Sequence, residues 1–596
     1  MAVEKLIVDH IDTWTTALQT RSTAGRGSSG KIDLYGIKKL RELILELAVR
    51  GKLVPQDPND EPASELLKRI AAEKAELVKQ GKIKKPKPLP EISEEEKPFE
   101  LPEGWEWVRL NDVAEYIQRG KGPKYSEYGH VKVVSQKCVQ WNGFKLEQSR
   151  WITDESVAAY TEERFLKDGD VLWNSTGAGG TAGRVIYLPA VTEKLVVDSH
   201  VTLIRTIKQN GQFICNYIST YGIQQRFDPK HPNTLLSGTT NQAELNASVV
   251  TSFITPFPPQ KEQERINSKV AELMCLCDQL EQHSLSSLDA HQQLVETLLA
   301  TLTDSQNADE LAENWARISE HFDTLFTTEA SIDALKQTIL QLAVMGKLVP
   351  QDPNDEPASE LLKRIAQEKA QLVKDGKIKK QKPLPPISDE EKPFELPEGW
   401  EWVKLGYILH DIKYGTSQKC DYNISGYPVL RIPNIVKGII DLADIKYGAL
   451  TDSELKDLTL NENDLLFIRS NGSTNIVGQS TLVQQDLKDH AYAGYIIRVR
   501  LHNKYINATY INMIMKSNLI REQIEGPIRT TTGVKNINSN ELMGLLVPLP
   551  PKNEQGIIIK KISEIDTTIS NLKVNIQSAQ QTQLHLADAL TDAAIN

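Results

Sequence analysis

The sequence predicts an α+β fold with two mixed α/β domains, separated by two long antiparallel helices of the coiled-coil type in a pseudo-twofold, circular arrangement. Three observations support this prediction. A block of sequence occurs twice, each half of the chain ends in a heptad-spaced helix, and each half contains a body rich in short strands. A chain of 596 residues also exceeds what one hydrophobic core usually organises.

The first observation is a tandem duplication. The stretch GKLVPQDPNDEPASELLKRIA is found at residues 51–71 and again, unchanged, at residues 346–366. It lies inside a longer repeat, since residues 40–110 and 335–405 align without a gap and agree at 59 of 71 positions. The period of 295 residues is far longer than the roughly 20 to 50 residues of a solenoid repeat, so a domain-sized unit has been copied.

Each copy of the repeat predicts a helix and then an extended linker. In the first copy, DPNDEP supplies turn residues and a helix N-cap from Asn59, Asp60 or Glu61. Apolar residues recur at helical spacing up to Ile70, and Gly81 is expected to end the helix. The Pro- and charge-rich stretch that follows predicts a linker, which stops at tryptophans that can anchor the next body. These are Trp105 and Trp107 in the first copy and Trp400 and Trp402 in the second.

These signals divide the chain into five parts. We expect a helical region with its linker at 1–100, a mixed domain at 101–260, a central helical region with its linker at 261–400, a second mixed domain at 401–551 and a C-terminal helix at 552–596.

Long helices are expected where PFPPQKEQERI and PLPPKNEQGII end the mixed domains. Apolar residues then alternate in steps of four and three, the spacing of a coiled-coil seam, and an offset of 292 residues gives both helices one register. Each helix is therefore the expected antiparallel partner of the other, over roughly 60 Å; the alternative is that each packs only on its own domain. The expected seam residues are Ile266, Val270, Leu273, Cys277, Leu280, Leu294 and Leu298, then Ile558, Ile562, Ile565, Ile569, Leu572, Ile576, Ala579, Leu586 and Leu590.

The two mixed domains are predicted from short Val-, Ile- and aromatic-rich runs broken by Gly, Asn and Asp. Such runs are GDVLWNSTG and SHVTLIRTI in the first domain, and NDLLFIRSNGS and AGYIIRVRL in the second. The interiors of the two domains diverge although their ends match. Two domains whose ends are copied and whose interiors differ predict one shared framework that presents two different binding surfaces.

Charge does not exclude a nucleic-acid partner, although the net charge is −10. Residues 101–260 carry 16 basic and 16 acidic side chains, and residues 401–550 carry 16 and 15. Residues 261–330 carry 4 and 14, which accounts for the whole deficit. Two near-neutral bodies can still gather their basic side chains on one face.

Cysteine usage and hydropathy point to a cytoplasmic protein. The five cysteines are odd in number and lack CxxC spacing, so they indicate neither a disulfide framework nor a zinc site. No apolar run approaches the roughly eighteen residues of a membrane span, and the N-terminus does not resemble a signal peptide.

Catalytic motifs are missing from the sequence. GRGSSGKI at 25–32 resembles a phosphate loop, but Ile32 stands where Ser or Thr would hold magnesium, and a flexible loop is the better interpretation. GAGGTAG at 177–183 departs from the dinucleotide fingerprint and fits a Gly-rich turn. There is no HExxH, GxSxG or Asn/Asp-Pro-Pro-Tyr, and isolated histidines such as His200 are interpreted as structural. We therefore assign no catalytic, metal or cofactor residue and expect a binding or scaffolding protein.

Polar, glycine-rich loops recur at matching places in both mixed domains and are candidates for DNA contact. Arg can pair with guanine and Asn or Gln with adenine, while Lys and hydroxyl groups hold phosphates. Each loop alone is better explained as a solvated turn, so the recurrence carries the hypothesis. The candidate residues are Arg119, Lys121, Lys124, Asn174, Ser175, Thr176, Arg184, Thr239, Thr240 and Asn241 in the first domain, and Lys413, Tyr414, Gln418, Lys419, Arg469, Asn471, Arg529, Thr530, Thr531 and Lys535 in the second.

Taken together, the ordered motifs resemble the specificity subunit of type I restriction-modification enzymes. The matching marks are LPEGWEWV before each mixed domain, GDVLWNSTG and NDLLFIRSNGS within them, PPQKEQ and PPKNEQ after them, and LAVRGKLV and LAVMGKLV closing the helical regions. The resemblance covers residues 31–596. One departure is the helical block at the N-terminus, where many members begin directly with a recognition domain.

The resemblance implies a non-catalytic subunit whose two target recognition domains each read half of a bipartite, asymmetric duplex DNA site. It implies two methyltransferase partners and two restriction (translocase-nuclease) partners, which would hold the S-adenosylmethionine, ATP and Mg. In a pseudo-symmetric ring, the N-terminal block would follow the C-terminal helix in space as the central block follows the first long helix in sequence. We expect the repeated block to dock partners through Leu66, Leu67, Lys68 and Arg69, and through Leu361, Leu362, Lys363 and Arg364.

Two other functions stay open at this point. A structural adaptor without DNA contact would fit the acidic charge, and salt-dependent binding to duplex DNA would exclude it. A single-chain site-specific methyltransferase or nuclease would need a catalytic constellation that the sequence does not offer.

Overall fold

A computed structural model describes residues 3–21, 31–177, 180–238, 243–376, 383–526, 529–531 and 534–595. The chain forms two compact units of mixed helix and sheet, which confirms the predicted α+β class. Unit 1 comprises Met1–Thr20, Ile32–Leu285 and Gln580–Asn596, and unit 2 comprises Arg21–Lys31 and Ser286–Ala579. Each unit therefore gathers stretches that lie far apart in the sequence.

In unit 1, the mixed domain is built on an antiparallel sheet with the strand order β10-β9-β12-β4. A smaller sheet has the order β11-β5-β8, in which β11 runs parallel to β5. The strands are β3 (Glu106–Arg109), β4 (Ala114–Arg119), β5 (Lys132–Val134), β6 (Val139–Gln140), β7 (Gly143–Phe144), β8 (Arg150–Trp151), β9 (Val171–Asn174), β10 (Val185–Tyr187), β11 (Leu195–Val197), β12 (Val201–Thr206) and β13 (Ile254–Phe257). The domain's helices are α5 (Leu110–Val113), α6 (Asp154–Val157), α7 (Gly211–Ile218), α8 (Tyr221–Gln225) and α9 (Ala247–Ser252).

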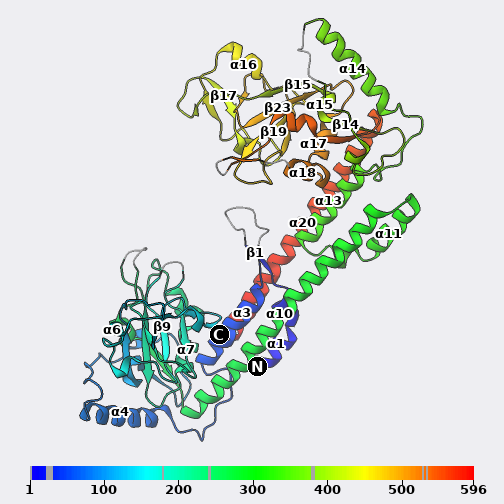
Figure 1. The fold of residues 1–596 in the computed structure, drawn as a ribbon. Coiled ribbons are helices and arrows are strands. Elements are labelled where there is room, and N and C mark those ends of the chain that lie inside the picture. The colour runs from blue at the N-terminus through cyan, green and yellow to red at the C-terminus, as the bar shows by residue number, and fades with distance from the viewer. Residues whose placement is uncertain are drawn as a thin grey trace. The chain divides into compact units, whose positions relative to one another are not determined.

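In unit 2, the mixed domain repeats this plan with the strand order β15-β23-β19-β21 (Figure 1). The strands are β14 (Glu401–Lys404), β15 (Leu409–Tyr414), β16 (Cys420–Asp421), β17 (Tyr427–Leu430), β18 (Lys446–Gly448), β19 (Leu465–Ile468), β20 (Ser470–Asn471), β21 (Ser480–Leu482), β22 (Ala491–Tyr492), β23 (Ile496–Leu501), β24 (Arg529–Thr531), β25 (Val534–Asn536) and β26 (Leu546–Leu549). The domain's helices are α15 (Leu405–Ile408), α16 (Asp452–Leu458), α17 (Ala508–Ile514), α18 (Asn518–Glu525) and α19 (Ser539–Gly544).

Both long helices exist as predicted. Helix α10 (Gln260–Asp304) begins in unit 1 and ends in unit 2, whereas α20 (Lys552–Ile595) begins in unit 2 and ends in unit 1. Outside the mixed domains lie α1 (Val3–Asp9), α2 (Ile11–Thr16), β1 (Gln19–Arg21), β2 (Lys31–Asp33), α3 (Tyr35–Val49), α4 (Ala63–Lys79), α11 (Ala308–Glu320), α12 (Phe322–Leu325), α13 (Glu329–Val344) and α14 (Ala358–Lys374).

Most residues predicted for the seam are buried in the first half of each helix, and the buried positions shift by one residue in the second half. Ile266, Val270, Leu273 and Cys277 are buried, as are Ile558, Ile562 and Ile569. Leu294 and Leu586 are 51% and 42% exposed, so their assignment to the seam was wrong. The buried residues are instead Val295 and Leu299 in α10, and Ala587 and Thr591 in α20. These replacements keep the offset of 292, so the shared register holds.

The repeated block holds the start of each long helix. Trp105 Nε1 donates to Glu262 Oε2 at 3.0 Å, and Trp400 Nε1 donates to Glu554 Oε2 at 2.9 Å. Gly51 (φ +66°) lies against Trp105, and a Cβ there would reach Pro102 Cγ at 2.5 Å. The second copy reproduces this contact around Gly346. The linker end, the block and the helix start therefore meet at one buried point in each unit.

The predicted helix N-cap was wrong. Helix α4 begins after Pro62, which occupies the N-cap without a side-chain hydrogen bond. Asp60 instead pairs with Arg265 at 2.6 Å and so ties the turn to α10. The predicted helix end is confirmed, because α4 stops at Lys79 and Gly81 adopts a φ of +71°.

A lysine of each block caps the end of a long helix. Lys52 Nζ donates to Ile595 O at 2.6 Å in unit 1, and Lys347 Nζ donates to Thr303 O at 2.7 Å in unit 2. Cations near the last carbonyls of a helix satisfy free acceptors and favour the helix dipole. The N-terminal block thus caps the end of α20 in the same way as the central block caps the end of α10.

We expect Glu262→Gln to make the stability of unit 1 less dependent on pH. Burial raises the pKa of Glu262, so the folded chain binds more protons than the unfolded chain, and stability falls as pH rises above the ordinary value of 4.5. Gln cannot ionise but still accepts from Trp105. Glu262→Ala should cost about 1–3 kcal/mol, because Trp105 loses its buried acceptor.

Urea unfolding followed by tryptophan fluorescence at several pH values measures both effects. Glu554→Gln is the matched variant in unit 2, where burial also raises the pKa of Glu554. Equal pH dependence in the wild type and in Glu262→Gln would contradict the assignment.

Candidate nucleic-acid interface

The main sheet of the first mixed domain brings four strand ends to one edge. Its neighbouring strands are antiparallel, so the ends of β4 and β9 meet the starts of β12 and β10. The segments that carry Arg119, Thr176 and Arg184 all leave the sheet there. Glu244 closes this edge through backbone bridges to Thr176 and Ser237. We call these four strand ends, together with Ser237 and Glu244, edge 1.

Three candidate side chains at edge 1 are held by specific contacts. Arg119 Nη1 pairs with Glu244 Oε2 at 2.9 Å, and its Nε donates to Ser199 O. Thr176 Oγ1 and His200 Nδ1 share a hydrogen bond of 2.6 Å. Arg184 donates to Gly180 O at 3.0 Å and to Gln140. The side chains of Arg119, Thr176 and Arg184 are partly exposed, so they are positioned and remain accessible.

The other seven candidates of the first domain behave differently. Lys121 and Lys124 are exposed on the loop after β4, where Lys121 Nζ donates to Ala159 O at 2.7 Å. Asn174 and Ser175 are fully buried. Asn174 donates to two backbone carbonyls, and Ser175 Oγ lies 2.5 Å from Thr202 Oγ1. Asn174 and Ser175 therefore hold the strand end and present no side chain to a ligand, a correction to the predicted set. Thr239, Thr240 and Asn241 lie outside the described residues.

The second domain forms an equivalent edge. The ends of β15 and β19 meet the starts of β23 and β21, and β25 pairs with both β20 and β24. We call this set edge 2. Arg469 stacks over the Tyr414 ring at 4.8 Å, and the Tyr414 hydroxyl donates to Ser539 Oγ at 3.1 Å. Arg529, Thr530 and Thr531 form β24, and only their backbone is described.

The remaining candidates of the second domain surround edge 2. Lys413 pairs with Asp457 at 3.1 Å, and Gln418 contacts Glu454 at 3.4 Å. Lys419 is exposed. Asn471 accepts from the backbone of Ser473 at 3.0 Å, and Lys535 donates to Thr474.

The two edges share one backbone frame. Gly120 N donates to Val201 O at 3.1 Å, and Gly415 N donates to Ile496 O at 3.2 Å. A Cβ at either glycine would collide with backbone carbonyl oxygens of the opposite segment, so only glycine fits. Ser175 N donates to His200 O, and Arg469 N to Tyr495 O, both at 2.8 Å.

Prediction from the sequence missed His200, Glu244 and Tyr495. Tyr495 is 64% exposed and occupies the position of His200, immediately before the central strand. His200 was interpreted as structural because its partner Thr176 is distant in sequence. An aromatic ring directly before the apolar run that forms β12 in the first domain and β23 in the second is the signal that could have found both.

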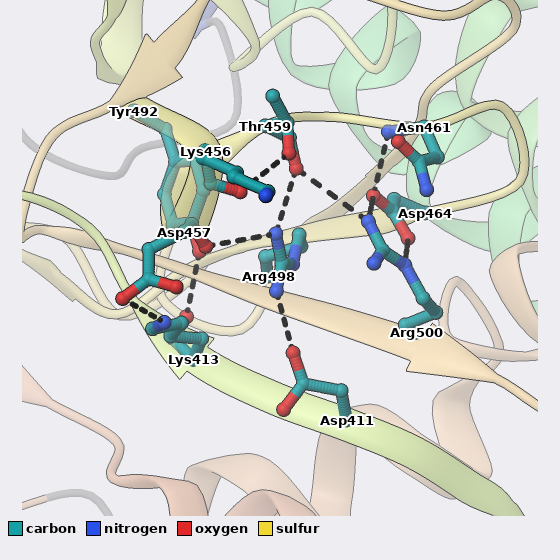
Figure 2. Close-up of polar contacts among 10 residues, drawn as sticks. All are labelled: Asp411, Lys413, Lys456, Asp457, Thr459, Asn461, Asp464, Tyr492, Arg498 and Arg500. Carbon is teal, nitrogen blue, oxygen red and sulfur yellow. Dashed lines mark hydrogen bonds and ion pairs between the residues drawn. The ribbon is translucent and has the colours of Figure 1, made fainter. Parts of the chain in front are cut away.

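The acidic residue of the motifs GDVLWN and NDLLFI is structural. Asp170 is fully buried and accepts from Arg205 Nε and Nη2, each at 2.7 Å. Asp464 is fully buried and accepts from Arg500 at 2.7 and 2.6 Å, as Figure 2 shows. The preceding Gly169 and Asn463 have φ values of +86° and +70°, which turn the chain into the strand.

A second arginine crosses the same sheet in unit 2. Arg498 donates to Asp411 Oδ2 and to Thr459 O, the latter at 2.7 Å. In Figure 2, Arg498 and Arg500 extend from one strand toward the loop that contains Thr459. Arg498 and Arg500 hold the loop that contains Thr459 against β23. These basic residues of β23, the strand that pairs with the NDLLFI strand β19, therefore stabilise the fold.

The docking candidates lie on α4 and α14. Leu66 and Leu361 are 1% exposed and Leu67 and Leu362 are partly exposed, so the two fully buried leucines pack within the chain and are not available to a partner. The charged candidates are exposed and pair locally: Lys68 with Glu65, Arg69 with Glu61, Lys363 with Glu360 and Arg364 with Glu356.

Comparison with known proteins identifies the family. The family described as type I restriction modification DNA specificity domain matches residues 102–290 and 397–580. The chain is 51% identical to the type I restriction enzyme EcoAI specificity subunit of Escherichia coli and 50% identical to the EcoEI specificity subunit of the same species, with all of each chain covered. This chain belongs to the type I restriction-modification specificity family.

The two family matches include the two mixed domains, which we call target recognition domains 1 and 2 from here on. A solved structure described as the basis of complex assembly and conformational transition of the type I R-M system has a TM-score of 0.50 and 15% identity. It covers 84% of this chain and 99% of that chain, and it supports the fold. Among the described residues, no group of three or more His, Cys, Asp and Glu could hold a metal ion, and no helix could span a membrane.

We expect Asp170→Ala to destabilise recognition domain 1 by about 3–5 kcal/mol, because it leaves the Arg205 guanidinium buried without its carboxylate. The Arg205 side chain is 8% exposed. The double variant Asp170→Ala/Arg205→Met should recover part of the loss. Chemical unfolding measures both.

The control is Asp168→Ala, which removes an exposed carboxylate two residues away and should cost under about 1 kcal/mol. Similar losses for Asp168→Ala and Asp170→Ala would show that the buried pair has no special role.

Proposed function

We propose that this chain is the DNA sequence-specificity subunit of a type I restriction-modification complex, and that each recognition domain reads one half of a bipartite, asymmetric duplex site. The observation that carries the proposal is the pair of equivalent sheet edges, which share a backbone frame and differ in their side chains. Two identical edges would suit a symmetric site, whereas two different edges suit two different half-sites.

The side chains at the edges fit duplex DNA. Arg119 and Arg184 at edge 1, and Lys413, Arg469 and Lys535 at edge 2, supply cations for phosphates and for guanine. Acidic neighbours hold two of these cations, Arg119 and Lys413, so local ion pairs can orient them before DNA arrives. A protein that replaces counterions on phosphates binds less tightly as salt rises, so salt-dependent binding of this chain to duplex DNA would exclude an adaptor without DNA contact.

The catalytic work belongs to partner subunits in this proposal. Two methyltransferase subunits would carry S-adenosylmethionine, and two restriction subunits would carry ATP and Mg, in the cytoplasm where the DNA lies. The chain offers the same helical block twice, and a repeated surface suits two copies of one partner. The exposed charges on α4 and α14 are the proposed docking points.

Exchange of residues 110–250 for those of a related chain should change only one half of the recognised sequence. Recognition domain 1 has its own core, and β3 and β13 close it, so its edge can change without altering recognition domain 2. Sequencing of methylated adenines in cells that carry the chimera and its methyltransferase measures both half-sites. A change in both halves would contradict modular reading.

Charge reversal at Lys68 and Arg69 should lower methyltransferase stoichiometry from two per chain to one. Their local ion pairs are exposed, and such pairs contribute about 0–1 kcal/mol, so the fold should survive. Reversal at Lys363 and Arg364 is the matched variant in the second copy, and both together should abolish docking. Native mass spectrometry reports the stoichiometry; two partners bound at unchanged affinity with both copies reversed would show that this face does not dock them.

A further inference from the structure

The shared frame allows each residue of edge 1 to be matched with one of edge 2. The bonds of Gly120 and Gly415 match Arg119 with Tyr414, and those of Ser175 and Arg469 match His200 with Tyr495. Asn174 N donates to Arg184 O at 2.8 Å, and Ile468 N donates to Gln479 O at 2.9 Å in the equivalent place. Arg184 is thereby matched with Gln479.

The last match lies on the bridged residue that closes each edge. Glu244 bridges Thr176 and Ser237, and Asn536 pairs with Ser470 and Arg529 in the same pattern. The following residues repeat the match, since Leu245 N donates to Ser175 O at 2.7 Å and Ile537 N donates to Arg469 O at 2.9 Å. One backbone position therefore carries a carboxylate in domain 1 and an amide in domain 2.

These matched positions differ in chemistry although their backbone is the same. The pairs are Arg119 and Tyr414, Arg184 and Gln479, His200 and Tyr495, and Glu244 and Asn536. Side chains that hold only the backbone frame need not change when the frame is kept; the buried Asp170 and Asp464 illustrate this, since both are aspartates with an arginine partner. Differences between the matched side chains at edges 1 and 2 are what the recognition of two different DNA half-sites requires.

Glu244 is unusual among these residues because it places a negative charge where phosphates are expected. Its side chain is 41% exposed and pairs with Arg119, which also donates to Ser199 O. Arg119 balances the charge and fixes the carboxylate between two strand ends. A carboxylate held at a DNA edge accepts hydrogen bonds only, so it selects bases that present an amino group.

We propose that this matched position determines base preference in both domains: Glu244 accepts from a cytosine N4 amino group, and Asn536 pairs with adenine through its amide. The proposal rests on the proposed function, since it concerns how the same edges read DNA. A carboxylate repels the acceptor edges of guanine and thymine, whereas an amide both donates and accepts, which matches adenine N7 and N6. The two half-sites are therefore expected to differ at this contact.

The test is selection from a random-sequence duplex library by the full chain bound to its methyltransferase subunit, followed by sequencing. For Glu244→Gln, we expect at least about a tenfold loss of preference for cytosine at one position of one half-site, with the other half-site unchanged. Asn536→Asp should do the same to an adenine position in the other half-site. Glu193→Gln is the matched control, because Glu193 is 38% exposed and pairs with Lys132 away from edge 1.

The outcomes separate this inference from the proposed function. If the wild-type complex enriches no sequence even at low salt, the proposed function fails. If the wild type enriches a bipartite motif and both variants enrich the same motif at every position, the inference is overturned. A variant that loses its whole half-site has lost the edge's fold, and the variant in the other domain then decides. Uniformly weaker binding with unchanged preference would assign Glu244 and Asn536 to the frame, which also overturns the inference.

Discussion

The frame of each unit depends on a buried hydrogen bond between a tryptophan and a glutamate. Trp105 and Glu262 in unit 1, and Trp400 and Glu554 in unit 2, connect the end of a linker to the first turn of a long helix. Burying a carboxylate is unfavourable unless it is well hydrogen-bonded, and Gln351 also donates to Glu554 at 3.2 Å. The direction in which each long helix leaves its domain is thereby fixed by a polar contact, which is more directional than apolar packing.

Duplication separates the residues that build the frame from those that differ. The glycines, tryptophans and glutamates around the helix starts recur because each copy must make the same turn and bury the same contact. The Asp–Arg pairs recur at the sheet because each carboxylate also accepts from a backbone N–H of the turn before it, Lys167 N at 2.7 Å and Asn461 N at 2.8 Å. At the edges, the backbone bonds recur while Arg119, Glu244 and their counterparts change. The backbone hydrogen bonds preserve the strand ends in both domains and place no requirement on the side chains at the edges, which can therefore vary.

Much of the fold could be predicted from local sequence, and the errors have common physical causes. Heptad spacing predicted both long helices and their offset, but it placed Leu294 and Leu586 in the seam where Val295 and Ala587 are buried. Over many turns the helical period drifts from a strict heptad, so a seam counted from one end loses its phase. The N-cap was misplaced because Asp60 pairs with Arg265, some 200 positions away.

The candidate interface was harder to predict because it is assembled from distant segments. Matching loops in both domains suggested Arg119, Arg184 and Arg469, which lie at the edges; their contact with DNA stays a prediction. Asn174 and Ser175 belong to the same loops but turn inward, and no local pattern separates them from Thr176. Glu244 and His200 acquire their places only through contacts across the sheet, with Arg119 and with Thr176.

The ends of α10 and α20 keep the same register of buried positions, but different kinds of interaction hold them. In unit 2, α10 buries Val295, Leu299 and Leu302, so apolar area stabilises its end. The matched positions of α20 in unit 1 are Ala587 and Thr591, which bury less. Polar ties to α3 replace the missing area: the Tyr35 hydroxyl donates to Asp588 at 2.7 Å, and Lys39 pairs with the same carboxylate at 3.4 Å. The frame therefore constrains the position of each helix, but not the kind of interaction that holds it. In the same way, the edges keep one backbone frame while their side chains differ.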